Sequence, residues 1–193
     1  VSERPASAGD ITPWVTVGDA RLALAVLAAA FYRRPSADMQ VVGITGTNGK
    51  TTTAYLVASI FDAAGVRCGI LGTVGYRVGD ETREATYTTP EAPEVQSLLR
   101  EMADRGCGAC AMEVSSHALS LRRADEVTFA AGVFTNLTRD HLDFHADMEA
   151  YFQAKRRLFE LLPPGAPGLI NLDDPRGASL VEMAGRPVTY AID

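Results

Sequence analysis

Residues 46–52 have the residue types that hold nucleotide phosphates: Gly-Thr-Asn-Gly-Lys-Thr-Thr. They follow the apolar run 40–45, so the chain is expected to pass from a buried strand through a glycine-rich turn into a helix that begins at Lys50. Glycines let backbone N–H groups approach an anion, and the helix N-terminus adds its dipole. Lys50 can reach the β- and γ-phosphates, and the Thr51 hydroxyl can hold Mg²⁺. The sequence therefore predicts a site for a nucleoside triphosphate with magnesium.

The loop departs from the common P-loop pattern, which places a glycine five residues before Gly49. This chain has Ile44 there, and its glycines lie at positions 43, 46 and 49. The alternative is a glycine-rich turn that binds nothing. The strand, loop, lysine, hydroxyl and helix occur in the required order, which favours a phosphate loop with its own spacing.

A carboxylate ends a second apolar segment, in Met112-Glu113-Val114-Ser115-Ser116-His117. Ligands of a doubly wound sheet bind beyond the carboxyl ends of its strands, where Glu113 is expected. Glu113 is therefore predicted to bind the Mg²⁺ that Thr51 holds. A strand-to-helix turn with Ser115 or Ser116 as the N-cap is the other interpretation, and both can hold at once.

The turn after the apolar strand that includes residues 129–134 is dense in polar side chains. His141 lies there between Asp140 and Asp143, and it is a candidate second metal ligand or phosphate contact. His145 is the weaker candidate and is expected to be structural.

Lys155 interrupts an apolar helical stripe. Positions 148, 152, 155, 159 and 162 fall on one face of the predicted helix, and all except Lys155 are apolar. A lysine on a buried face must extend to solvent, pair or be modified. Helical periodicity does not decide between a functional lysine and a lysine that reaches solvent.

The segment Thr86-Tyr87-Thr88-Thr89-Pro90-Glu91 places hydroxyl groups before a predicted helix. Proline is common in the first helical turn, and an acidic side chain is favourable there. One interpretation is helix capping by these hydroxyls. The other is a second site, for an anion or a sugar, at the start of that helix.

Strands and helices alternate around these residues. The pattern predicts strands at 40–45, 68–72, 109–114, 127–135, 168–172 and 187–192, and helices at 50–64, 91–104, 147–162 and 176–184. A further helix, capped by Asp19, is expected through Tyr32 after an irregular lead-in over residues 1–11. Residues 73–88 predict an inserted β-hairpin around Gly79-Asp80. This order indicates an α/β fold, a mostly parallel sheet with helices on both faces.

Composition narrows the functional classes. The chain has 193 residues and a net charge of −6, so it lacks the basic footprint of a nucleic-acid-binding protein. No signal peptide is visible, and the longest apolar stretch, residues 22–31, is too short to span a bilayer. Three cysteines fit a reducing compartment, and the lone Cys107-Gly-Ala-Cys110 predicts structural cysteines. A cytoplasmic protein without membrane insertion is expected.

Taken together, the motifs resemble those of the Mur ligases, ATP-dependent amide-forming enzymes of peptidoglycan synthesis, a process linked to cell-wall biogenesis, cell shape and cell division. The matching segments are GTNGKTT at 46–52, TTPE at 88–91, MEVSSHAL at 112–119, FTNLTRDHLDFH at 134–145 and the Ala-Lys pair at 154–155. They run in the family's order with its spacing, over about residues 15–193. TTPE and MEVSSHAL are most similar to the UDP-N-acetylmuramoyl-tripeptide synthetases of the family.

The resemblance implies a reaction. ATP phosphorylates the free side-chain carboxylate of D-glutamate in UDP-MurNAc-L-Ala-D-Glu, and the amine of a diamino acid, meso-diaminopimelate or L-lysine, attacks the acyl phosphate. The products are an amide, ADP and phosphate. Several anionic groups meet in this reaction, so two Mg²⁺ ions and Lys50 are expected to offset their repulsion.

The resemblance also implies roles by position. Gly46, Thr47, Asn48, Gly49, Lys50, Thr51 and Thr52 hold the triphosphate, and Asn171 and Asp174 approach the nucleotide. Thr51 and Glu113 serve one magnesium, and His141 and a carbamylated Lys155 serve the other. Lys50, His141 and Lys155 are the catalytic residues. Thr88, Thr89, Ser115 and Arg123 contact the UDP-muramoyl substrate. Two positions depart from some family members, with Tyr87 in place of asparagine and Leu121 in place of glutamine.

The same resemblance suggests the domain organisation. Residues 1–35 are expected to be the end of an N-terminal UDP-binding domain and a linker, and 36–193 an incomplete central ATP-binding domain without the C-terminal amino-acid-binding domain. A monomer is expected, which alone binds nucleotide but does not ligate. Two alternatives remain: a sister ligase, of the folylpolyglutamate or cyanophycin synthetase type, and a non-catalytic nucleotide-binding module. MEVSSHAL and TTPE argue against the first, and the second leaves Lys155 and His141 without a role.

Overall fold

The computed structural model describes residues 1–7 and 13–192, so part of the expected lead-in, residues 8–11, lies outside the described residues. Within the described chain, one eight-stranded sheet has the order β4-β3-β2-β5-β1-β6-β7-β8. Its strands are β1 (Gln40–Thr45), β2 (Cys68–Leu71), β3 (Tyr76–Val78), β4 (Glu81–Arg83), β5 (Ala109–Glu113), β6 (Phe129–Phe134), β7 (Pro167–Asn171) and β8 (Arg186–Tyr190).

The sheet is parallel from β2 to β8, which confirms the predicted fold class. The segment predicted as a hairpin forms β3 and β4, which pair antiparallel around Gly79-Asp80 and extend the sheet beyond β2. Central β1 and β5 are almost entirely buried, as expected of strands covered on both faces. Their register places Ile44 beside Glu113, so the turns that follow the two strands emerge next to each other.

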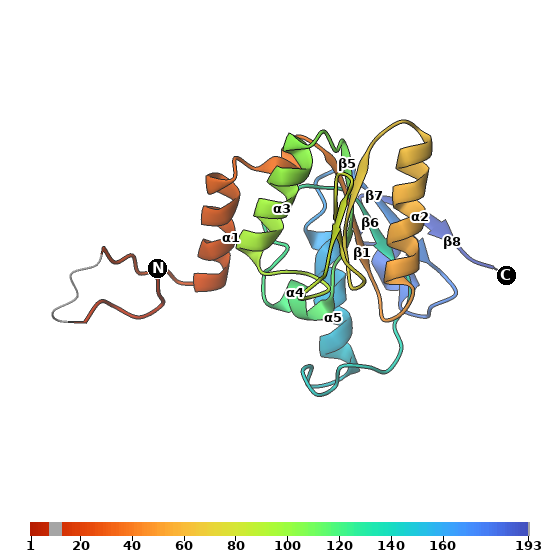
Figure 1. Cartoon of the computed structure of the whole chain (residues 1–193). Helices are drawn as coiled ribbons and strands as arrows, with labels where there is room; N and C mark the ends of the chain where they lie inside the picture. Colours follow the sequence, from red (N-terminus) through yellow and green to blue (C-terminus); the bar gives the residue numbers. More distant parts are fainter. Residues whose placement is uncertain (8–12, 193) are drawn as a thin grey trace.

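Helices cover both faces of the sheet (Figure 1). The larger helices are α1 (Ala20–Phe31), α2 (Lys50–Ala63), α3 (Ala92–Asp104) and α5 (Met148–Glu160), and shorter ones are η1 (Pro35–Ala37), α4 (Ser116–Ser120) and α6 (Gly177–Val181). Helix α2 packs through Ala54 and Ala58 against one face. Helices α3, α5 and α6 share the core of the opposite face, and α1 packs on α3.

Asp19 caps α1, as predicted, by accepting a hydrogen bond from the Leu22 N–H (2.9 Å). Asp147, which was predicted to be the first residue of its helix, is instead the N-cap of α5 and accepts a hydrogen bond from the Ala150 N–H (2.7 Å). The region around Pro90 differs from the expectation. Helix α3 begins at Ala92, so Pro90 precedes it and Pro93 occupies its first turn.

Three elements are shorter than predicted by three residues or more. β6 begins at Phe129 instead of residue 127, because residues 121–126 form turns in which Arg122 and Glu126 have positive φ. Helix α5 ends at Glu160, and α6 spans five residues where nine were expected, with a turn after Val181. Hydrophobic periodicity continues through such turns, so it overestimated these elements.

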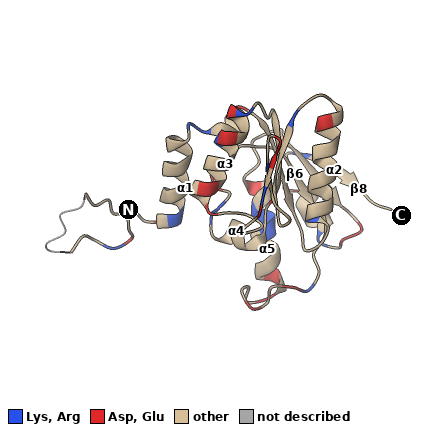
Figure 2. Cartoon of the chain, in the orientation of Figure 1, with Lys and Arg blue, Asp and Glu red and all other residues tan. Residues whose placement is uncertain are grey.

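The cysteines are structural, as predicted. Cys68, Cys107 and Cys110 are free and buried. Burial raises the pKa of the Cys68 thiol to about 11 and raises that of Cys110 as well, which keeps both protonated. Acidic and basic residues are interspersed over the helices and loops (Figure 2). Among the described helices, none is long and apolar enough to cross a membrane.

Candidate functional site

The loop between β1 and α2 has the backbone of an anion-binding turn. Gly46 and Gly49 have φ values of 146° and 83°, a region that favours glycine, and Gly49 is the N-cap of α2. In the described part of the chain, the N–H groups of residues 49–52 donate to no protein acceptor. Four free donors at a helix N-terminus are suited to phosphate oxygens.

The segment after β6 holds this loop in place. The carbonyl of Asn136 accepts a hydrogen bond from Thr47 N–H (2.8 Å), and its side-chain oxygen accepts one from Asn48 N–H (3.0 Å). Thr135 donates its hydroxyl to the Asn48 carbonyl (2.7 Å). Asn136, Thr135 and Thr138 therefore shape the loop, a role that sequence reasoning missed. These contacts depend on the pairing of β6 with β1, which local sequence patterns do not indicate.

Replacing Gly46 with alanine is expected to disrupt the loop. A Cβ at this position would overlap the Thr135 hydroxyl oxygen and lie 3.1 Å from the Asn136 backbone nitrogen. The positive φ adds a conformational cost of about 1–2 kcal/mol, and the overlap adds about 1–3 kcal/mol. We expect a lower free energy of unfolding by chemical denaturation and loss of nucleotide binding by calorimetry.

Gly65→Ala is the matched control. Gly65 also has a positive φ, 76°, but a Cβ there would meet no atom within 4 Å. The control should show only the conformational cost and keep nucleotide binding. Equal losses of binding in both variants would contradict a special role for the loop packing at Gly46.

The two lysines of the chain, Lys50 and Lys155, meet at one carbonyl oxygen. Lys50 donates to the carbonyls of Gly46 (3.0 Å) and Thr47 (2.9 Å), and Lys155 donates to that of Gly46 (2.7 Å). Lys155 is 1% exposed, so it does not reach solvent along its helix. It lies beneath the loop instead.

Both lysines have lowered pKa values. Burial, and secondly the positive charge of Lys50, lowers the pKa of Lys155 to about 6. Burial also lowers the pKa of Lys50, against the opposing charges of Glu113 and Asp140. Lys155 is therefore mostly a neutral amine at pH 7, and a neutral amine is the form that reacts with CO₂.

Glu113 presents a buried carboxylate at the end of β5. It is 1% exposed and accepts hydrogen bonds from the N–H (3.1 Å) and hydroxyl (3.2 Å) of Thr73. No cation pairs with it among the described residues. No group of three or more His, Cys, Asp or Glu side chains able to hold a metal is found in that part of the chain either. Magnesium commonly binds one or two carboxylates together with substrate phosphates, so the buried Glu113 carboxylate is a suitable ligand without a complete protein cage.

A hollow of about 280 Å³ is lined by Lys50 and by residues that follow β4, β5 and β6. It brings together most of the predicted substrate and catalytic residues: Lys50, Thr88, Thr89, Ser115, Arg123 and His141. Tyr87, Leu121 and His117 complete its lining. Both positions that depart from the family pattern, Tyr87 and Leu121, therefore face the same space as the predicted substrate residues.

Hydrogen bonds organise the substrate side of this hollow. Thr89 donates its hydroxyl to the Glu113 carbonyl (2.8 Å) and accepts from Ser115 N–H (3.0 Å), so it ties two segments together instead of capping α3. Ser115 caps α4 by accepting from Ala118 N–H (3.1 Å). Arg123 donates to the Thr89 carbonyl (3.1 Å), pairs with Glu91 (2.7 Å) and lies over the Tyr87 ring.

All three histidines of the chain lie close together. The ring centroids of His117 and His141 are 4.9 Å apart, and those of His117 and His145 are 5.6 Å apart. Burial lowers the pKa of His117 and of His145, and a neighbouring imidazole lowers each further. His141 adopts a positive φ of 52° and lines the hollow, whereas His145 is buried and hydrogen-bonded to the Ser116 hydroxyl (2.9 Å).

Asn171 and Asp174 contact the segment after β6 that binds the loop. Asn171 donates to the Thr135 carbonyl (2.8 Å), and Asp174 accepts from Leu137 N–H (2.6 Å). Neither residue lines the hollow. Their side chains support the segment that holds the phosphate loop, and direct contact with a nucleotide stays a prediction.

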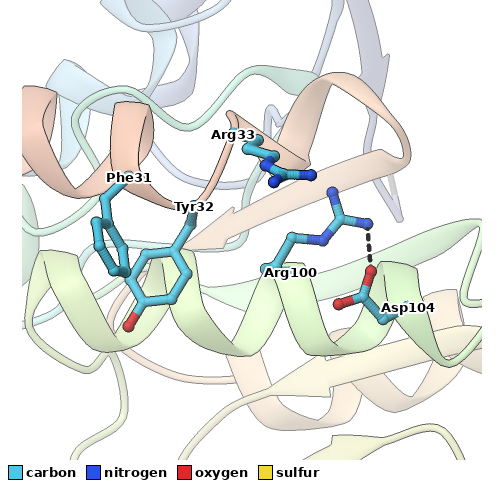
Figure 3. A pocket seen from close by; sticks show the side chains of 5 residues that line it. All are labelled: Phe31, Tyr32, Arg33, Arg100 and Asp104. Carbon is cyan, nitrogen blue, oxygen red and sulfur yellow. Dashed lines mark ion pairs between the residues drawn. The ribbon is translucent and has the colours of Figure 1, made fainter.

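A second hollow, of about 340 Å³, lies at the amino-terminal edge of the sheet (Figure 3). Phe31, Tyr32 and Arg33 line it from the end of α1, and Arg100 and Asp104 line it from α3. Arg100 pairs with Asp104 (2.8 Å) and Asp38 (3.2 Å), so its charge is compensated. Ligands of such sheets bind beyond the carboxyl ends of the strands. This hollow lies at the opposite edge of the sheet, so it is not the candidate site.

Sequence comparison identifies relatives of the chain. A sequence model of the Mur ligase middle domain matches residues 44–193. A curated protein of Geobacter metallireducens, "UDP-N-acetylmuramoyl-L-alanyl-D-glutamate--2,6-diaminopimelate ligase", is 52% identical over 97% of this chain and 38% of its own length. The chain thus spans about two fifths of that relative.

Comparison with solved structures also identifies relatives of the chain. A solved "UDP-N-acetylmuramoyl-L-alanyl-D-glutamate--2,6-diaminopimelate ligase" is 30% identical, with a TM-score of 0.84, over 97% of this chain and 39% of its own. A bifunctional folylpolyglutamate synthase/dihydrofolate synthase of Yersinia pestis, 17% identical with a TM-score of 0.62 over 95% of this chain and 49% of its own, shares the fold alone. Because its sequence matches the middle-domain model over residues 44–193, the chain belongs to the Mur ligase family.

Proposed function

We propose that the full-length protein is an ATP-dependent, ADP-forming ligase that adds a diamino acid to UDP-MurNAc-L-Ala-D-Glu in peptidoglycan synthesis. The observation that carries this proposal is the single hollow shared by Lys50 of the phosphate loop and the hydroxyl and arginine side chains predicted to contact the muramoyl substrate. A ligase that phosphorylates its substrate must bring the γ-phosphate to the acceptor carboxylate, and one shared space does this.

The groups of this chain have distinct roles in the proposed reaction. The free N–H groups at the start of α2 bind the triphosphate, and Lys50 neutralises charge on the transferred phosphoryl group. Thr88, Thr89, Ser115 and Arg123 orient the muramoyl peptide, so that its carboxylate oxygen attacks the γ-phosphorus and ADP leaves. The amine of the diamino acid then attacks the acyl carbon, loses a proton and displaces phosphate.

Two Mg²⁺ sites are part of the proposal. Thr51 and Glu113 would hold one ion, and His141 with a modified Lys155 would hold the other. Bound magnesium would supply positive charge to the phosphate oxygens during phosphoryl transfer.

The modification of Lys155 has support in its environment. The neutral amine attacks the carbon of CO₂ and loses a proton, which leaves a carbamate with negative charge. Burial next to Lys50 both keeps the amine neutral and provides a cation beside the new carboxylate-like group. Modification thus explains a lysine inside an apolar stripe.

We further propose that residues 1–35 are the end of a UDP-binding domain and a linker, and that residues 36–193 are a central ATP-binding domain. Large apolar side chains exposed on α1 and α2 support contact with further domains: Leu24, Leu27, Phe31, Leu56 and Ile60.

The names of curated relatives favour 2,6-diaminopimelate over L-lysine as the amino acid that the protein adds. We expect a monomeric, cytoplasmic enzyme.

The test is phosphate release by the full-length protein with ATP, Mg²⁺ and UDP-MurNAc-L-Ala-D-Glu, with diaminopimelate and L-lysine supplied separately. Release that depends on the muramoyl peptide and on diaminopimelate is expected. The 193-residue chain alone should bind ATP and form no tripeptide. Folate-dependent ATP turnover would instead indicate a sister ligase, and ATP binding without turnover on any of these substrates would indicate a nucleotide-binding module.

A further inference from the structure

Tyr151 occupies the centre of the floor beneath the phosphate loop. It projects from α5, is fully buried and is among the largest side chains with no exposure to solvent. It contacts the loop through its hydroxyl, and Lys155 and two histidines through its ring.

The hydroxyl of Tyr151 completes the hydrogen bonding of Thr47. A threonine hydroxyl has one proton to donate and two lone pairs that accept. Thr47 accepts from Thr138 N–H (3.0 Å) and donates to the Thr138 carbonyl (3.3 Å). The Tyr151 hydroxyl lies 3.1 Å from the Thr47 hydroxyl, and the hydrogen bond between them links α5 to the phosphate loop.

The ring of Tyr151 packs against the other side of the site. The ammonium or amine nitrogen of Lys155 is 4.4 Å from the ring centroid. The ring centroids of His145 and His141 lie 5.0 and 5.9 Å from that of Tyr151. Phenylalanine preserves all of these ring contacts, so Tyr151→Phe changes the hydroxyl alone.

We propose that Tyr151 is a positioning residue for ATP in the ligase reaction, acting through its hydroxyl on Thr47. By fixing Thr47, it sets the path of the loop from Gly46 to Gly49, and so the direction of the free N–H groups that follow. The proposal rests on the proposed function. It predicts an effect on the nucleotide and none on the muramoyl peptide, because Tyr151 does not line the hollow in which that substrate is expected.

The test measures ATP affinity by calorimetry and the KM values of both substrates for Tyr151→Phe in the full-length protein. Loss of one buried hydrogen bond that orders the loop is expected to weaken ATP binding about three- to tenfold. The KM for the muramoyl peptide should change less than twofold. Tyr76→Phe is the matched control, because Tyr76 is also buried and donates its hydroxyl to a backbone carbonyl, that of Tyr87 (2.7 Å). It should lower thermal stability similarly and leave ATP affinity unchanged.

A double-mutant cycle with Thr47→Ala separates positioning from general stability. If the Tyr151 hydroxyl acts through Thr47, adding Tyr151→Phe to Thr47→Ala should change ATP affinity no further. Full additivity, or ATP affinity within twofold of wild type in Tyr151→Phe, would overturn the proposal while an active wild-type ligase leaves the proposed function intact. A wild-type protein that binds no ATP would refute the proposed function itself.

Discussion

Replacing Lys155 with methionine is expected to lower ligase turnover by a factor of about 10²–10³ and, at the same time, to stabilise the fold near pH 7. Turnover falls because the variant can form no carbamate and loses the charge proposed to serve catalysis. Stability rises because methionine fills the same apolar stripe without a group that resists burial. Exchanging a buried ionisable group for an apolar one of similar size often stabilises by about 1–4 kcal/mol.

The pH dependence of the free energy of unfolding shows whether removal of the ionisable Lys155 causes this stabilisation. The pKa of Lys155 is lowered from 10.5 to about 6 by burial and by Lys50. Between these values the unfolded chain binds more protons than the folded one, so the free energy of unfolding rises with pH. The destabilisation caused by burying Lys155 is greatest below pH 6 and disappears towards pH 10.5. The advantage of Lys155→Met over wild type should therefore shrink as pH rises through this window, by at most about 1.4 kcal/mol per pH unit.

The measurement is chemical denaturation in CO₂-free buffer from pH 6 to pH 10. Arg156→Met is the control, because Arg156 is the next residue on α5, more than a third exposed, and pairs with Glu160. It should change stability by less than about 0.5 kcal/mol at every pH. A stability difference for Lys155→Met that does not vary with pH would show that Lys155 does not titrate in this window.

Carbamylation has its own readout. The chain has two lysines, so ¹³CO₂ labelling should give one carbamate NMR signal from side chains, and that signal should vanish in Lys155→Met. A signal that persists in this variant and is lost in Lys50→Met would assign the modification to the other lysine.

Local patterns predicted the scaffold well, because each element contains its own signal. The strand over residues 40–45 and the helix that begins at Lys50 occur where expected, since β-branched residues, glycines and a helix start follow one another. Predictions were weaker where a turn continues an apolar pattern. Val127 looked like part of a strand, yet it lies between the turn at residues 121–126 and the start of β6.

Contacts between distant segments were beyond local pattern. Asn136 and Thr138 are 88 to 91 residues from the loop residues that they bind. Lys155 was recognised as unusual from its helical face, but its partner, the Gly46 carbonyl, is 109 residues away. Such pairings depend on the strand order, which places β6 beside β1. Residue types in the sequence do not indicate that order.

Replacing Lys50 with methionine is expected to weaken ATP binding by at least tenfold and to reduce turnover by about 10²–10³. Lys50 now donates to two carbonyls of the loop, and its nitrogen would exchange these for phosphate oxygens when the nucleotide binds. Calorimetry separates this variant from Lys155→Met, which should retain ATP binding because Lys50 and the N–H groups of residues 49–52 remain, and Tyr151 still holds Thr47. Equal ATP affinity in Lys50→Met and wild type would exclude Lys50 as a phosphate ligand.

Lys50→Met also tests the coupling between the two lysines. The positive charge of Lys50 is the second largest cause of the lowered pKa of Lys155. Removing that charge should raise the pKa of Lys155 above about 6, so a larger fraction of it is protonated at pH 7. The stability of Lys50→Met should then begin to rise at higher pH than that of wild type, and its carbamate NMR signal should be weaker at pH 7. An unchanged pH window would mean that burial alone sets the pKa of Lys155.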